Sequence, residues 1–178
     1  LLTFNIYNML FKSVLKIKQN LQVKETISDY IFSGNLGEVK IKKNNNMSLV
    51  INKSELIIRT NEKKFNRLYS VLIKKAIDGV LFGHISRLKL VGIGYYVEIK
   101  DSYLVFKLGY SHEIKVLIPA SIEIYIKKRR KLTILCHDLS ILSDFIFYIR
   151  SFRPPECYKG KGVLFKNEKI KLKVGKKN

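Results

Sequence analysis

The amino-acid sequence repeats itself after about 75 residues, and this duplication limits the possible folds more than any other feature of the chain. In the first half, residues 30–41 predict two strands joined by a glycine-containing turn. Residues 105–116 repeat that pattern, with Gly34 aligned with Gly109 and the letters EVKI aligned with EIKV. The two segments therefore predict equivalent hairpins in two similar domains.

Each half continues with a short β-branched strand, over residues 56–58 and 132–134, that leads into a segment with helical periodicity. Apolar side chains recur at a spacing of three and four in both segments, which is typical of a helix with one buried face. The expected apolar stripes are Phe65, Leu68, Leu72 and Ile73 in the first helix, and Leu142, Phe145, Ile146 and Ile149 in the second.

The expected ends of these helices follow from capping and helix-breaking residues. Asn61 is the expected N-cap of the first helix and Gly79 its expected C-terminal stop. Asp138 is suited to cap the second helix, and Pro154 prevents that helix from continuing. Between the halves, residues 88–99 predict a long strand interrupted by glycines, which mark a bulge or a close approach of the backbone.

Together these patterns predict an α+β protein made of two tandem domains of the same fold. Each domain is expected to contain a small, mostly antiparallel sheet packed with one helix. The expected boundaries are an N-terminal arm over residues 1–22, a first repeat over 23–83, a second repeat over 84–165 and a basic C-terminal tail over 166–178.

The net charge of the chain indicates a polyanionic partner. The sequence has 34 Lys and Arg against 14 Asp and Glu, which gives a formal net charge of +20. Nucleic acid neutralises such a chain most directly, because each bound phosphate releases a counterion. An anionic membrane is the alternative, but there is no uncharged apolar run of about 18 residues. Residues 1–19, apolar and basic, fit either an arm lying on a partner or a transit peptide.

The segment from Arg153 to Gly162, called the clamp below, combines the features of a phosphate-binding loop. Two prolines stiffen its start, and we expect its glycines to open main-chain amides to an anion while neighbouring lysines add charge. Beyond it, residues 169–174 alternate lysine with apolar residues, which places the lysines on one face of an extended segment. Four tyrosines are suited equally to stacking on bases or to packing: Tyr95, Tyr96, Tyr110 and Tyr158.

No residue pattern indicates a metal, a cofactor, a small-molecule substrate or catalysis. The three histidines lack metal-site spacing, and the two cysteines form no CxxC pair. The run Cys136-His137-Asp138 resembles a triad only in composition, because adjacent strand residues point to opposite faces; Cys136 is expected in the core. A small basic RNA-processing enzyme that uses His112 or His137 is the alternative function, and RNA cleavage would distinguish it.

Three motifs together resemble the bacterial-type large-subunit ribosomal protein L-six family. They are residues 90–95 (LVGIGY), 108–112 (LGYSH) and 153–163 (RPPECYKGKGV), in the order and spacing of that family. The likeness extends from about residue 84 to the C-terminus, whereas in the first half it depends mainly on residues 34–39. The resemblance implies two tandem α+β domains and a structural role in the large ribosomal subunit.

The same resemblance implies contacts with large-subunit rRNA close to the sarcin-ricin region, where translational GTPases bind, and with neighbouring ribosomal proteins. The chain departs from the family at Tyr96, Cys157 and the Leu164-Phe165 pair, so two guanidinium contacts are expected to be absent. The expected rRNA contacts are Gly92, Gly94, Tyr95, Ser111, His112, Arg153, Tyr158, Lys159, Gly160, Lys161 and Gly162, supplemented in the tail by Lys166, Lys169, Lys171 and Lys173.

The amino-acid usage bears on the compartment. The chain has 27 lysines and 23 isoleucines but only two alanines, a bias typical of an AT-rich genome. With a bacterial-type sequence, this bias favours a mitochondrial ribosome, and a plastid or the cytoplasm of an AT-rich bacterium remain the alternatives.

Overall fold

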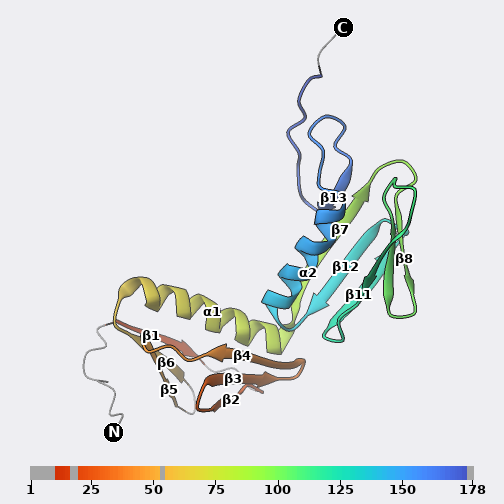
Figure 1. Ribbon diagram of the computed structural model, residues 1–178. Coiled ribbons are helices and arrows are strands. Elements are labelled where there is room, and N and C mark those ends of the chain that lie inside the picture. Colours follow the sequence, from red (N-terminus) through yellow and green to blue (C-terminus); the bar gives the residue numbers. More distant parts are fainter. Residues whose placement is uncertain (1–10, 17–19, 53–54, 176–178) are drawn as a thin grey trace. The chain divides into compact units, whose positions relative to one another are not determined.

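The computed structural model describes residues 11–16, 20–52 and 55–175, which form two compact units (Figure 1). Unit 1 comprises the described residues up to Gly83, with residues 137–139 grouped beside them, and unit 2 comprises the remainder of the chain from His84. Each unit contains antiparallel sheets and one long helix, so the expected α+β class with two tandem domains is confirmed.

Unit 1 consists of two three-stranded antiparallel sheets and helix α1. One sheet has the order β1-β6-β5 and the other the order β2-β3-β4. The predicted hairpin is formed by β3 and β4, which pair from Asp29 opposite Lys42 to Gly34 opposite Gly37. The strands are β1 (Phe11–Lys16), β2 (Gln22–Glu25), β3 (Asp29–Gly34), β4 (Gly37–Lys42), β5 (Met47–Ile51) and β6 (Glu55–Thr60).

Helix α1 (Lys63–Phe82) differs from its prediction at both ends. Its N-cap is Glu62 rather than Asn61, and no side chain caps it. Its C-cap is Gly83, with φ 74° and an amide that donates to the Gly79 carbonyl, whereas Gly79 itself is buried within the helix. A glycine just beyond the last turn ends a helix because it adopts positive φ without a Cβ clash.

The buried face of α1 is rotated from the predicted stripe. Ile73 is fully buried as expected, but Leu68 and Leu72 are 50% and 42% exposed. Apolar residues occur on both sides of this helix, and only packing against the sheets selects which side is covered. The buried face consists of Asn66, Tyr69, Ile73, Ala76, Ile77, Gly79 and Val80.

Unit 2 has a three-stranded sheet of order β10-β9-β8, a four-stranded sheet of order β11-β12-β7-β13, and helix α2 (Leu139–Phe152). All four residues of the predicted α2 stripe are buried, and the helix ends two residues before Pro154. Cys136 is also buried, as expected. The strands are β7 (His84–Val91), β8 (Tyr96–Lys100), β9 (Tyr103–Lys107), β10 (Ile114–Leu117), β11 (Ile122–Lys127), β12 (Lys131–Cys136) and β13 (Gly162–Phe165).

The two units share one plan. The order β1-β6-β5 in unit 1 corresponds to β7-β12-β11 in unit 2, and β2-β3-β4 corresponds to β8-β9-β10. Strand β1 is therefore the counterpart of β7, and residues Phe11–Lys16 belong to a sheet rather than to the expected N-terminal arm. Its six residues pair with β6 because their backbone groups complete the sheet edge. Residues 1–10 of the expected arm lie outside the described residues.

The expected long strand over residues 88–99 is instead two strands in different sheets. Strand β7 ends at Val91 and β8 begins at Tyr96, and the turn between them contains both glycines. Unit 2 also has β13, which pairs with the other side of β7 and has no counterpart among the strands described in unit 1. Neither described helix is long and apolar enough to cross a membrane.

Candidate RNA-binding surface

The three family-like motifs meet in unit 2 around the side chain of Tyr95. This residue is only 5% exposed, so of the two roles expected for its ring the structure selects packing. A Cβ built on Gly92 would lie 2.6 Å from the Tyr95 ring, and one on Gly109 would lie 3.0 Å from it. Both positions therefore need glycine because the ring lies against their backbone. Tyr95 joins the β7–β8 turn to the end of β9.

Tyr110 continues this connection to the clamp. Its hydroxyl donates to the Phe152 carbonyl at 2.8 Å, and the Arg153 guanidinium carbon lies 5.1 Å from the Tyr110 ring centroid. The hydrogen bond with Tyr110 raises the pKa of Arg153, and Tyr95 adds to the shift. His112 also stacks on Tyr110, with ring centroids 6.0 Å apart. Arg153, Tyr110 and His112 thus form one continuous aromatic and cationic surface.

The backbone of the clamp is held by its own hydrogen bonds. The Val163 amide donates to the Arg153 carbonyl at 2.9 Å, and the Glu156 amide donates to the Lys161 carbonyl at 2.9 Å. The Gly160 amide donates to the Glu156 carbonyl at 3.1 Å, so it is not directed at an outside anion as the sequence analysis expected. The clamp is a closed loop that presents its side chains.

Gly162 is required for a different reason from the one expected. Its φ is +137°, and a Cβ there would lie 2.7 Å from the Pro154 carbonyl oxygen. The glycine lets the returning strand pass close to the first proline, which closes the loop. The clamp backbone is occupied by its own hydrogen bonds, and its positive charge is presented by the side chains of the exposed Lys159 and the half-buried Lys161.

The basic tail runs beside the clamp (Figure 1). The Lys173 amide donates to the Cys157 carbonyl at 2.9 Å, and a Cβ on Gly160 would lie 3.5 Å from the Leu172 side chain. The tail is extended rather than a strand, and its lysines are exposed: Lys166, Lys169, Lys171 and Lys173. Clamp and tail therefore combine their positive charges in one part of unit 2.

Glu168, which no sequence pattern indicated, anchors the start of the tail. One carboxylate oxygen accepts a hydrogen bond from Arg150 at 2.9 Å, and the other accepts one from the Phe165 amide at 2.8 Å. The Arg150 guanidinium carbon also lies 4.2 Å from the Phe165 ring centroid. The Glu168 carboxylate thus pairs with Arg150 of α2.

The remaining predicted contacts occupy turns and the exterior of unit 2. Gly94 lies in the β7–β8 turn with φ +72° and open space around it, and Ser111 and His112 are exposed between β9 and β10. Tyr158 is 57% exposed at the clamp, whereas Leu164 is buried in β13 and presents no polar group there. In the described part of the chain, no three His, Cys, Asp or Glu residues gather as metal ligands would.

Comparison with known proteins gives a consistent result. The model of the family described as Ribosomal protein L6 matches residues 91–166, which include the second and third motifs in full and all but the first residue of the first motif. Large ribosomal subunit protein uL6 of Mycoplasmoides gallisepticum is 35% identical over 170 residues, covering 92% of this chain and 93% of that protein. The corresponding uL6m protein of Prototheca wickerhamii is 31% identical over 185 residues, covering 93% of this chain and 95% of its own length.

A third relative, protein uL6c of Porphyra purpurea, is 35% identical over 135 residues, covering 73% of this chain and 75% of that protein. Similarity at this level extends across both units rather than across the motif region alone. These relatives are ribosomal proteins and not enzymes, so this chain has a structural role in the large ribosomal subunit and in translation. The chain belongs to the uL6 family of large-subunit ribosomal proteins.

Proposed function

We propose that unit 2 binds large-subunit rRNA through the clamp, the tail and the turns gathered around Tyr95. The observation that carries this proposal is the meeting of three separated motifs on one surface, joined by Tyr95, Tyr110 and Arg153. Exposed lysines attract phosphates without regard to base identity, whereas exposed aromatic rings and guanidinium groups stack on unpaired bases. Residues 84–165 supply the main contacts, and the tail from residue 166 adds charge.

The family resemblance supports a more specific location. In the proposed arrangement, the contacted rRNA lies near the sarcin-ricin region, close to where translational GTPases bind, and neighbouring ribosomal proteins contact the rest of the chain. The proposed compartment is the mitochondrial matrix. The lysine-rich and alanine-poor composition supports it, and relatives include proteins with mitochondrial, plastid-type and bacterial names.

The charge contribution of the clamp is tested by Lys159→Ala combined with Lys161→Ala. Binding of a bacterial large-subunit rRNA transcript is measured over a range of salt concentrations. The variant should bind more weakly, and its log-log salt dependence should flatten by roughly one to two units, because each phosphate contact contributes about one. The matched control, Lys100→Ala with Lys115→Ala, removes the same charge from exposed positions outside the proposed surface. Equal slopes for both pairs would reject the clamp as a phosphate site.

The location on the rRNA is tested through Cys157, which is exposed, whereas Cys136 is buried. An iron chelate attached to Cys157 produces hydroxyl radicals that cleave nearby RNA in assembled large subunits. We expect cleavage in and beside the sarcin-ricin region and none with Cys157→Ser. Cleavage confined to a distant part of the rRNA would overturn the proposed location while leaving membership of the family intact.

A further inference from the structure

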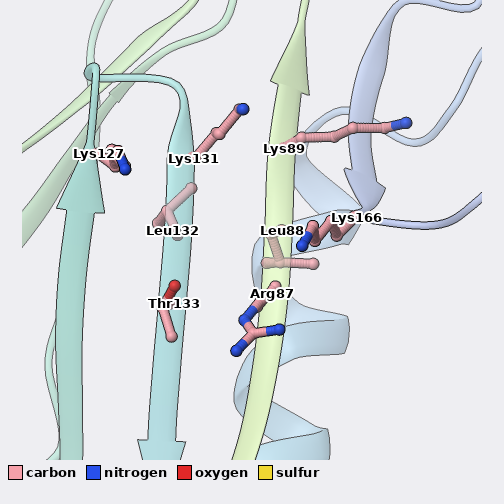
Figure 2. A pocket seen from close by; sticks show the side chains of 8 residues that line it. All are labelled: Arg87, Leu88, Lys89, Lys127, Lys131, Leu132, Thr133 and Lys166. Carbon is pink, nitrogen blue, oxygen red and sulfur yellow. The ribbon is translucent and has the colours of Figure 1, made fainter.

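A second concentration of positive charge lies in unit 2, on the four-stranded sheet (Figure 2). These charged side chains surround a groove of about 500 Å³ on one side of the strands. In Figure 2 the helix lies on the opposite side, behind β7. Side chains alternate along these strands, so Leu88 and Leu132 are buried while the neighbouring charged residues are directed outward. The polar residues that line the groove are Arg87, Lys89, Lys127, Lys131, Thr133 and Lys166.

Strand register aligns these cations across the sheet. Lys131 pairs directly with Lys127 on one side and with Lys89 on the other, which makes a row of three lysines on three adjacent strands. Arg87 lies opposite Thr133, and the Lys166 amide donates to the Arg87 carbonyl at 2.8 Å. Like charges placed directly opposite each other disfavour strand pairing. The described lining contains no acidic residue that would offset this repulsion.

The acid that lies beside Lys89 does not neutralise the row. Lys89 donates to the main-chain carbonyl of Glu168 at 3.4 Å, while the Glu168 carboxylate pairs with Arg150. The charge of Lys89 is therefore met by a neutral acceptor. Three adjacent strands span about 10 Å, which is wider than a single phosphate group. A ligand that matches the row carries several negative charges along its length.

The turn that joins β11 to β12 shows a second unusual feature. Lys128 and Arg129 adopt φ values of 54° and 51°, a conformation disfavoured for residues with a Cβ. Turns of this kind usually contain asparagine or glycine. Here five consecutive basic residues, 127–131, occupy the turn and its two flanking strand ends, and Arg129 pairs with Glu98 at 3.2 Å. Strained backbone of this kind is concentrated at functional sites.

We propose that this groove binds the phosphodiester backbone of an RNA strand, as a contact separate from the clamp. The inference rests on the proposed function, since it assigns a second rRNA segment to unit 2. Four of its five cations are lysines, which bind phosphates as point charges without selecting a base. Lys166 belongs both to the groove and to the tail, so the phosphate path is continuous with the first surface.

The test uses the full chain with Arg87→Gln, Lys127→Gln and Lys131→Gln, all three exposed residues. Binding of a bacterial large-subunit rRNA transcript is measured against salt concentration, beside the clamp pair Lys159→Ala with Lys161→Ala. We expect the groove variant to flatten the log-log slope by roughly two to three units. The matched control, Lys100→Gln with Lys107→Gln and Lys115→Gln, should retain the slope. Lys127→Arg with Lys131→Arg keeps the charge and should also retain it.

The outcomes separate the two proposals. If the groove variant keeps the slope of the unchanged chain while the clamp pair flattens it, the groove proposal is wrong and the proposed function stands. If neither flattens it, both fail. If the groove variant keeps its RNA slope but loses binding to poly-L-glutamate, the groove takes an acidic protein segment, which overturns the RNA assignment. Should the triple variant fail to fold, Lys127→Gln and Lys131→Gln apply the same test singly, at roughly one unit each.

Discussion

The backbone amide of Lys173 donates a hydrogen bond to the carbonyl oxygen of Cys157, with the two atoms 2.9 Å apart. This contact holds the tail against the clamp, and the Glu168 carboxylate fixes the start of the same tail through Arg150 and the Phe165 amide. The tail is consequently attached at two points about five residues apart in sequence. Its lysines are therefore presented on an ordered backbone, which lowers the entropy lost when they bind a polyanion.

Two variants of the tail separate the effect of its backbone contact with the clamp from the effect of its lysine charges. Removing residues 169–178 should speed amide exchange in the clamp, because the contact with Cys157 is lost, and should also weaken binding to rRNA. Replacing Lys169, Lys171 and Lys173 with Gln should weaken binding to a similar degree but leave clamp exchange unchanged. Hydrogen exchange followed by mass spectrometry distinguishes the two. Faster clamp exchange in the Gln variant would show that charge, rather than the backbone contact, orders the loop.

Gly162→Ala should destabilise unit 2 by about 1–3 kcal/mol. Its φ of +137° disfavours any Cβ, and the added atom would lie 2.7 Å from the Pro154 carbonyl oxygen. Since β13 begins at this residue, its pairing with β7 should weaken first. Urea unfolding with amide exchange in β7 and β13 measures the effect.

The matched control for that substitution is Gly94→Ala. Gly94 also has positive φ, +72°, but no atom lies within 4 Å of a Cβ built there. Only the conformational cost remains, which is about 1 kcal/mol. A larger loss at position 94 than at position 162 would contradict the assignment of steric closure to Gly162.

Features that depend on residues close together in the sequence were predictable, whereas features that depend on distant partners were not. The hairpin over residues 30–41 and the buried stripe of α2 were predicted because their patterns lie within a dozen residues. The buried face of α1 was misassigned because Leu68 and Leu72 satisfy the same spacing on the uncovered side. Strand β1 was missed because β6, the strand with which it pairs, lies about 40 to 50 residues further along the sequence.

In the candidate site, too, the local motif was predictable and the contacts made by folding were not. The sequence identified the clamp, but it attributed Gly160 to anion binding, whereas the Gly160 amide closes the loop internally. The alignment of Lys89, Lys131 and Lys127 depends on strand register, which single-sequence patterns do not determine. The sequence itself offers the run of five basic residues at 127–131, which indicates contact with a polyanion but not which other strands contribute cations.

Lys128→Gly should stabilise unit 2 by about 1 kcal/mol, because the residue has φ 54° and glycine adopts that conformation without a Cβ clash. Lys127→Gly removes the same charge from a strand position, where glycine is expected to cost about 0.5–1 kcal/mol. Thermal unfolding of the two variants should therefore shift in opposite directions. If both variants unfolded at a higher temperature than the unchanged chain, relief of charge repulsion would outweigh backbone strain in this turn.

Tyr30 gives unit 1 a pH dependence in the alkaline range. Burial raises the pKa of its phenol above the ordinary value of 10.0, although the hydrogen bond from the Leu49 amide partly opposes that shift. A raised pKa in the folded state means that this contribution to stability is complete below pH 10 and is lost as the pH rises through the folded-state pKa. Urea unfolding between pH 8 and about pH 11 measures the decline.

Tyr30→Phe is the control for that decline. It removes the titrating group, so the loss of stability above pH 10 should become shallower than in the unchanged chain, whose other tyrosines still titrate. At neutral pH the variant should be less stable by about 1–2 kcal/mol, because the buried Leu49 amide loses its acceptor. Parallel pH profiles for the two proteins would show that another group causes the alkaline loss.

The pairing of β13 with β7 determines when unit 2 is completed during synthesis. Strand β7 begins the unit at His84, whereas β13, which lies beside it, is translated after every other element of the unit. The nascent chain therefore holds one edge of β7 unpaired until residues 162–165 have left the exit tunnel. The loop between Arg153 and Gly162 closes only at that moment, so a truncated translation product lacks a formed clamp and should fail to compete with the finished protein for its place in an assembling subunit.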